Sequence, residues 1–122
     1  MLVLDLLSVT EGVNVSGDQA GFHALAVLVA GGGELALSDE GQLLGVLVEA
    51  TEGPVVAGLH DRRLTVRGGD EGRSILADEL RAVGDMDDGG HAHIEYFEGH
   101  FYLGAGSLPL ILISPHGGMP RR

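Results

Sequence analysis

The sequence contains no cysteine, no lysine and no tryptophan. Without cysteine, the chain has no disulfide, no thiolate metal site and no cysteine nucleophile. Basic residues are also few, because 7 arginines stand against 18 acidic residues and give a formal net charge of -11. A field of this sign repels phosphate backbones and favours basic partners, so we do not expect nucleic-acid binding.

Long apolar runs are missing as well. The N-terminal segment 1–7 has no basic residue and is interrupted by Asp5. No apolar run approaches the roughly 18 residues that a membrane span needs. We therefore expect a cytoplasmic protein with no membrane partner.

What the chain does contain is enough apolar residues for one core: 44% of its 122 residues are hydrophobic. This length suits one compact domain, which we place at residues 1–114. The remaining residues, 115–122, are rich in glycine, proline and arginine. They are expected to form a flexible C-terminal tail.

The apolar pattern predicts two amphipathic helices among short strands. Residues 18–30 and 70–83 carry apolar side chains at helical spacing, and the glycines at 31–33 end the first pattern. Short apolar or alternating runs predict strands at 2–7, 13–15, 34–37, 42–50, 55–60, 64–67, near 91–95 and at 107–114. Turn residues between the four middle strands suggest an antiparallel meander. The expected fold class is α+β, with a mostly antiparallel sheet and both helices packed on one face.

A faint internal repeat supports this layout. Val13-Asn-Val-Ser-Gly leads to Gly21 and Leu25, and Leu64-Thr-Val-Arg-Gly leads to Gly72 and Leu76. Each unit is a strand, a glycine turn and a helix. Chance convergence on a common strand-to-helix turn explains the similarity about as well as a true repeat.

A His-x-His pair is the best candidate for chemistry. Side chains two residues apart on a strand share a face, so His91, His93 and Glu95 lie on one side. Two imidazoles placed in this way can chelate one zinc ion. However, His91 and Glu95 lie about 13 Å apart along a strand, so a third ligand would have to come from His100, His116 or another strand. An exposed polar face with stacked histidines is the simpler interpretation, and we expect no cofactor.

No other catalytic set stands out. Glu95 and Glu98 lie on opposite faces of a strand unless the chain turns between them, which argues against an acid-base pair. The serines at 107 and 114 lack the glycine-flanked elbow of serine hydrolases. We therefore do not expect an enzyme.

The same region holds four of the five aromatic residues of the chain and three of its six histidines. One signature combines three parts of this region: His91-x-His-x-Glu-Tyr-Phe, a short Gly99-His100 loop with Tyr102-Leu103, and Ser107-Leu-Pro-Leu before a hydrophobic strand. This signature resembles the C-terminal part of a small bacterial immunity-protein family of polymorphic toxin systems.

The resemblance implies a compact α+β protein that binds and neutralises a cognate toxin without catalysis. An acidic surface would steer a basic toxin, and aromatic side chains would anchor it. The expected partner-binding residues are Glu95, Tyr96, Phe97, Glu98, His100, Phe101 and Tyr102. Two other interpretations stay open: a metal-binding module or metal-dependent enzyme centred on His91 and His93, and a domain that forms a homodimer through a sheet edge.

Overall fold

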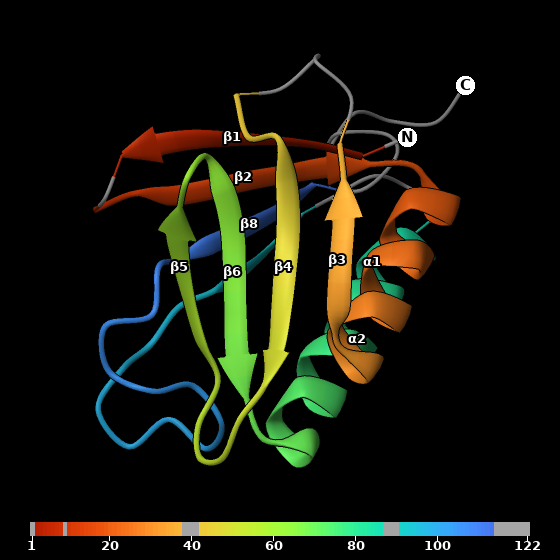
Figure 1. Cartoon of the computed structure of the whole chain (residues 1–122). Helices are drawn as coiled ribbons and strands as arrows, with labels where there is room; N and C mark the ends of the chain where they lie inside the picture. The colour runs from red at the N-terminus through yellow and green to blue at the C-terminus, as the bar shows by residue number, and fades with distance from the viewer. Residues whose placement is uncertain (1, 9, 38–41, 87–90, 114–122) are drawn as a thin grey trace.

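A computed structural model describes residues 2–8, 10–37, 42–86 and 91–113 (Figure 1). Within these residues the chain forms eight strands and two helices. They follow in the order β1 (Leu2–Ser8), β2 (Gly12–Gly17), α1 (Gln19–Gly31), β3 (Gly33–Ala36), β4 (Gly45–Ala50), β5 (Val56–His60), β6 (Arg63–Gly68), α2 (Asp70–Gly84), β7 (His91–Ile94) and β8 (Leu110–Ile113). The predicted tail, and the predicted end of the last strand at residue 114, lie outside the described residues.

The strands form two four-stranded sheets, in the orders β1-β2-β8-β7 and β3-β4-β6-β5. Each sheet has two antiparallel pairs and one central parallel pair, which is β2 with β8 in the first sheet and β4 with β6 in the second. The α+β class is confirmed. The meander predicted for the four middle strands is wrong, because β6 lies between β4 and β5.

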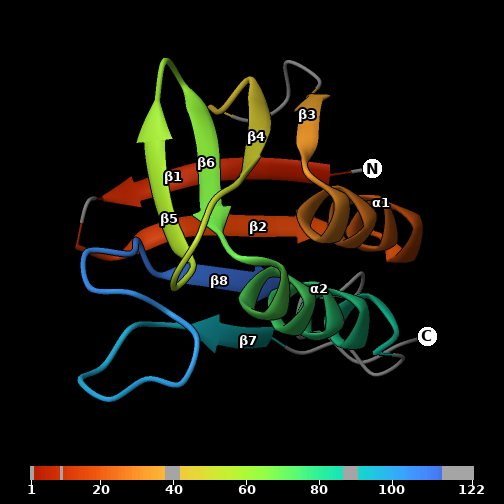
Figure 2. The same cartoon turned by 60° about the horizontal axis from the view of Figure 1, so that its bottom comes forward.

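The two sheets and the two helices enclose one core. In Figures 1 and 2 the strands of one sheet run across those of the other, and the helices lie side by side along one side. Helix α1 contacts β2, β3 and β4, and α2 contacts β6 and β8, so each helix packs against both sheets. Fully buried side chains of all these layers meet in the middle: Leu4, Val13, Val15, Phe22, Ala26, Val46, Leu64, Val66, Leu76, Leu80 and Leu112. Neither helix of the described chain is long and apolar enough to cross a membrane.

Local signals set the ends of the helices where the sequence predicts them. The Asp18 carboxylate accepts a hydrogen bond from the backbone N–H of Gly21 at 2.8 Å and caps α1. Gly32 ends this helix with a φ of 82°, a conformation that glycine adopts at little cost. Helix α2 begins after Gly69 with two acidic residues in its first turn, where the helix dipole favours them.

The two halves of the chain have the same order of elements. The first half has the order β1-β2-α1-β3-β4, and the second half has the order β5-β6-α2-β7-β8. Each sheet combines the hairpin of one half with the last two strands of the other half. The pairing is also equivalent, since β2 lies parallel to β8 as β6 lies parallel to β4. The faint sequence repeat therefore corresponds to a repeat of structure.

Candidate protein-binding site

The two halves differ most in the connection between their last two strands. In the first half this connection is residues 37–44, and in the second it is the longer segment 95–109. We call residues 95–103 the aromatic loop. It exposes 62% of Phe97, 75% of Phe101 and 37% of Tyr96, and no other large apolar side chain of the described residues is as exposed as Phe101.

The base of the aromatic loop is held against Val55, the residue before β5. Val55 N–H donates to the Tyr102 carbonyl and Gly104 N–H donates to the Val55 carbonyl, both at 2.8 Å. Further on, the hydroxyl of Ser107 accepts from Ala57 N–H at 2.9 Å. These bonds pair the outer edge of β5, so the loop starts from a fixed base and its tip projects from it.

His100 shapes the tip from within. Its Nδ1 accepts hydrogen bonds from the backbone N–H groups of Tyr102 at 3.2 Å and Leu103 at 3.0 Å. The neutral ring with its proton on Nε2 is the form that satisfies both bonds. The ring of Phe101 stacks on His100 with centroids 5.3 Å apart and an interplanar angle of 6°, so the exposed aromatic has a defined support.

Tyr102 points inward. Only 5% of the residue is exposed, and its hydroxyl donates to Oε2 of Glu79 at 2.9 Å. Burial, together with the Glu79 carboxylate, raises the pKa of the Tyr102 phenol. Tyr102 thus stays a neutral donor that joins the aromatic loop to helix α2.

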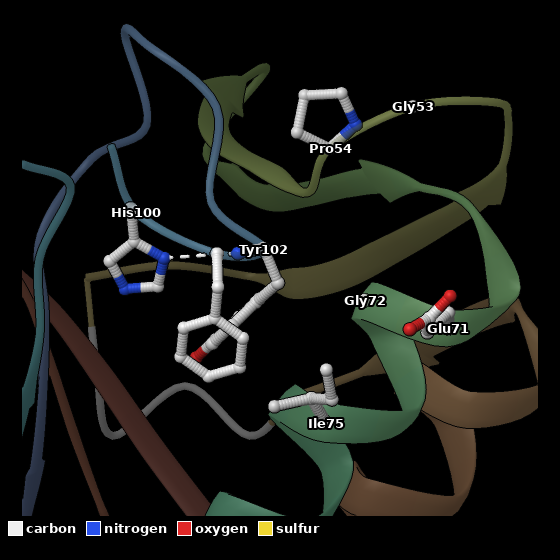
Figure 3. Close-up of a pocket in the computed structure, with 8 residues that line it drawn as sticks. Gly53, Pro54, Glu71, Gly72, Ile75, His100 and Tyr102 are labelled. Carbon is white, nitrogen blue, oxygen red and sulfur yellow. Dashed lines mark hydrogen bonds between the residues drawn. The ribbon is translucent and has the colours of Figure 1, made fainter. Parts of the chain in front are cut away.

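One open hollow of about 320 Å³ lies between the loop and the first turns of α2. Figure 3 shows Pro54 and Ile75 on opposite sides of it, with Glu71 across from Tyr102. Phe101 also lines this hollow. The site therefore offers apolar walls with one carboxylate at its margin.

A second hollow of about 340 Å³ is also lined by His100 and Tyr102. Its lining includes Glu79, Glu95 and Phe97. The two hollows share His100 and Tyr102, so they adjoin along α2.

Residues 63–115 match the family model of Immunity protein 32. The match runs from β6 to β8 and therefore includes α2 and the aromatic loop, whereas Gly53 and Pro54 of the first hollow lie outside it. It confirms the resemblance to an immunity-protein family. Comparisons with curated proteins and with solved structures gave no significant match.

The signature that carries the resemblance has structural roles apart from the loop tip. Ser107 ties the connection to β5, and the Pro109 carbonyl accepts from Val13 N–H at 2.9 Å. A side chain at Gly12, whose φ is 95°, would lie 2.0 Å from that same carbonyl oxygen, so this close approach requires glycine.

The histidines of the signature share a face of β7, as predicted. The rings of His91 and His93 have centroids 5.2 Å apart, and both side chains are exposed. Nδ1 of His93 lies 3.6 Å from Oε1 of Glu95. Among the described residues no group of three or more His, Cys, Asp or Glu could hold a metal ion, and His116 lies outside them.

Of the predicted partner-binding residues, the structure brings Glu95, Phe97, His100, Phe101 and Tyr102 to the two hollows. Tyr96 and Glu98 are exposed on the same loop and line neither hollow. Sequence reasoning missed the α2 residues that face the loop: Glu71, Ile75 and Glu79. Their spacing of four residues is typical of one helix face, but it does not show which segment lies opposite.

Proposed function

We propose that this protein is an immunity protein that neutralises a cognate toxin by binding it, without catalysis. The observation that carries the proposal is the exposure of Phe97 and Phe101 on a loop that is longer than the equivalent connection 37–44, whose sequence has no aromatic residue. Exposed aromatic side chains cost solubility and are typical of contact surfaces. The family match supports an immunity role for the same segment.

The excess of negative charge on the surface supports a basic partner. Each exposed arginine of the described residues already has an acceptor: Arg62 bonds the Gln42 carbonyl, and Arg63, Arg67 and Arg81 pair with Glu34, Glu49 and Asp78. The remaining surface therefore keeps the excess of carboxylates that gives the net charge of -11. Such a field speeds the encounter with a basic protein surface.

The proposal is tested by co-expressing the chain with the product of the adjacent gene. We expect the two proteins to co-purify. Expression of the neighbouring gene alone should stop growth, and co-expression of the chain should restore it. Absence of a complex with any neighbouring gene product, together with normal growth when that gene is expressed alone, would refute the immunity role.

Two loop variants then locate the contact. Phe97→Ala and Phe101→Ala should each weaken binding by about 1–3 kcal/mol if they are anchors. Val27→Ala is the matched control, because Val27 is 65% exposed on α1, away from the loop. Tyr102→Ala is less informative, since it also removes a core side chain. Equal effects of Val27→Ala and Phe101→Ala would contradict the assignment of the aromatic loop.

The metal alternative has a direct test. His91 and His93 supply two neighbouring imidazoles, whereas a structural zinc site normally has four ligands. We expect elemental analysis of protein purified without added metal to show no stoichiometric zinc or nickel. One equivalent of metal that disappears in His93→Ala would favour the metal-binding module.

A further inference from the structure

We propose that the hollow lined by Glu79, Glu95 and Phe97 receives an arginine side chain of the protein partner. The inference rests on the proposed function and deepens it, since it assigns the chemistry of one contact.

Glu79 and Glu95 supply the two carboxylates of this hollow. Glu79 is half-buried, and one of its oxygens accepts from the Tyr102 hydroxyl at 2.9 Å. Its second oxygen has no partner among the described groups. Glu95, from the start of the aromatic loop, lines the same hollow, and its only described polar neighbour is His93, at 3.6 Å. Two carboxylates thus border one hollow with acceptor capacity to spare.

The walls favour a guanidinium over a compact ammonium. Phe97 is 62% exposed, and its ring is tilted by 56° to the ring of His100, with centroids 4.7 Å apart. An aromatic face beside carboxylates suits the planar, weakly hydrated guanidinium, which can stack on the ring while it donates to both oxygens of a carboxylate. No lysine or arginine of the described chain lines this hollow.

The probe is N-acetyl-arginine amide, titrated into the full-length protein at about pH 8, where an ordinary histidine is neutral. Backbone amide signals of Ile94, Glu95, Phe97 and Tyr102 should shift in NMR spectra. The citrulline analogue, which has nearly the same shape without charge, should leave them unchanged. The lysine analogue should bind more weakly. Equal shifts with arginine and citrulline, or equal binding of arginine and lysine, would overturn the assignment.

Variants of the two carboxylates test the same site. Glu79→Gln removes the negative charge, yet the new amide oxygen can still accept the hydrogen bond from Tyr102, so the loop stays bonded to α2. This variant should weaken arginine binding about tenfold. Glu95→Gln, on an exposed side chain, should weaken binding about two- to fivefold. Asp78→Asn is the matched control, because Asp78 is the adjacent helix residue, pairs with Arg81 and does not line the hollow. Equal loss in Asp78→Asn and Glu79→Gln would refute the site.

The same variants separate this inference from the proposed function. A complex with the adjacent gene product that is insensitive to Glu79→Gln and Glu95→Gln would refute the arginine site and leave the immunity role intact. Binding of the arginine probe without any such complex would support the cation site and remove the immunity role.

Discussion

At the scale of single residues, Arg73 shows how one half of the molecule completes the other. It occupies the place in α2 that Phe22 occupies in α1, and both side chains are almost fully buried. The Arg73 guanidinium donates to the carbonyls of Val29 and Ala30 at 3.0 and 2.8 Å, and to that of Gly68 at 2.9 Å. Two of these carbonyls belong to the last turn of α1, which has no basic residue of its own.

Arg73→Met is therefore expected to destabilise the fold by about 3–5 kcal/mol, because the buried carbonyls of Val29 and Gly68 and the part-buried carbonyl of Ala30 lose their donor while the apolar stem is kept. Urea denaturation measures the free energy of unfolding. Arg81→Met is the control, since Arg81 pairs with Asp78 on the surface, and it should cost less than about 1 kcal/mol. Similar losses in both variants would show that the buried bonds of Arg73 do not stabilise the protein.

Asp85 gives a pH-dependent contact between the helices. Its carboxylate accepts from Nε2 of Gln19 at 2.8 Å and lies 2.7 Å from Nε2 of His23. The hydrogen bond from Gln19, followed by that from His23, lowers the pKa of Asp85. A carboxyl group whose pKa is lowered by folding stabilises the protein above its unfolded pKa, and this stabilisation disappears as the pH falls through the folded pKa.

The difference in unfolding free energy between the wild type and Asp85→Asn should accordingly be constant near neutral pH. It should shrink below about pH 4, the ordinary range of an aspartate pKa. Urea denaturation at several pH values measures it. A difference that stays the same from neutral pH down to the acid limit would contradict the role of the Asp85 charge.

At the scale of elements, the two helices end in glycines with different surroundings. A Cβ atom added to Gly84, the last residue of α2, would lie 2.7 Å from Cβ of Phe22, so the helices approach closely there. Gly31, the last residue of α1, has no atom within 4 Å of an added Cβ. Helix propensity favours alanine at both positions, but only one of them has room.

Gly84→Ala should therefore destabilise the protein by about 1–3 kcal/mol, because Phe22 is fully buried and cannot move aside without repacking. Gly31→Ala should be neutral or stabilise by up to about 1 kcal/mol. Thermal denaturation of the two variants gives opposite shifts of the midpoint if the close approach matters. Shifts of the same sign would argue against this packing.

At the scale of the whole molecule, the proposed binding would use the net charge of -11 and the aromatic loop at different steps. Exposed charge controls mainly the encounter, and it is screened within about 10 Å at 0.1 M salt. A buried anchor controls mainly the lifetime of the complex.

Added salt should thus slow association with the proposed toxin partner, on the order of tenfold between low and moderate ionic strength, with little change in dissociation. Phe101→Ala should speed dissociation and keep the same dependence on salt. Surface plasmon resonance separates the two rates. An association rate that does not respond to salt would contradict electrostatic steering.

The sequence by itself determined the elements and their apolar faces. Apolar spacing located both helices to within a residue or two. The shared face of His91 and His93 followed from the alternation of a strand. These features depend on neighbours a few residues apart, so a local pattern contains the information needed to predict them.

Only the tertiary structure decided which strands meet in the centre of each sheet, and which helix face lies against the aromatic loop. The parallel pairs β2 with β8 and β4 with β6 join segments far apart in the chain. The bonds of Arg73 to α1 and of Tyr102 to Glu79 arise in the same way. Several pairings satisfy the same alternation of apolar residues, and the one that forms is the one that closes a common core over both sheets and both helices.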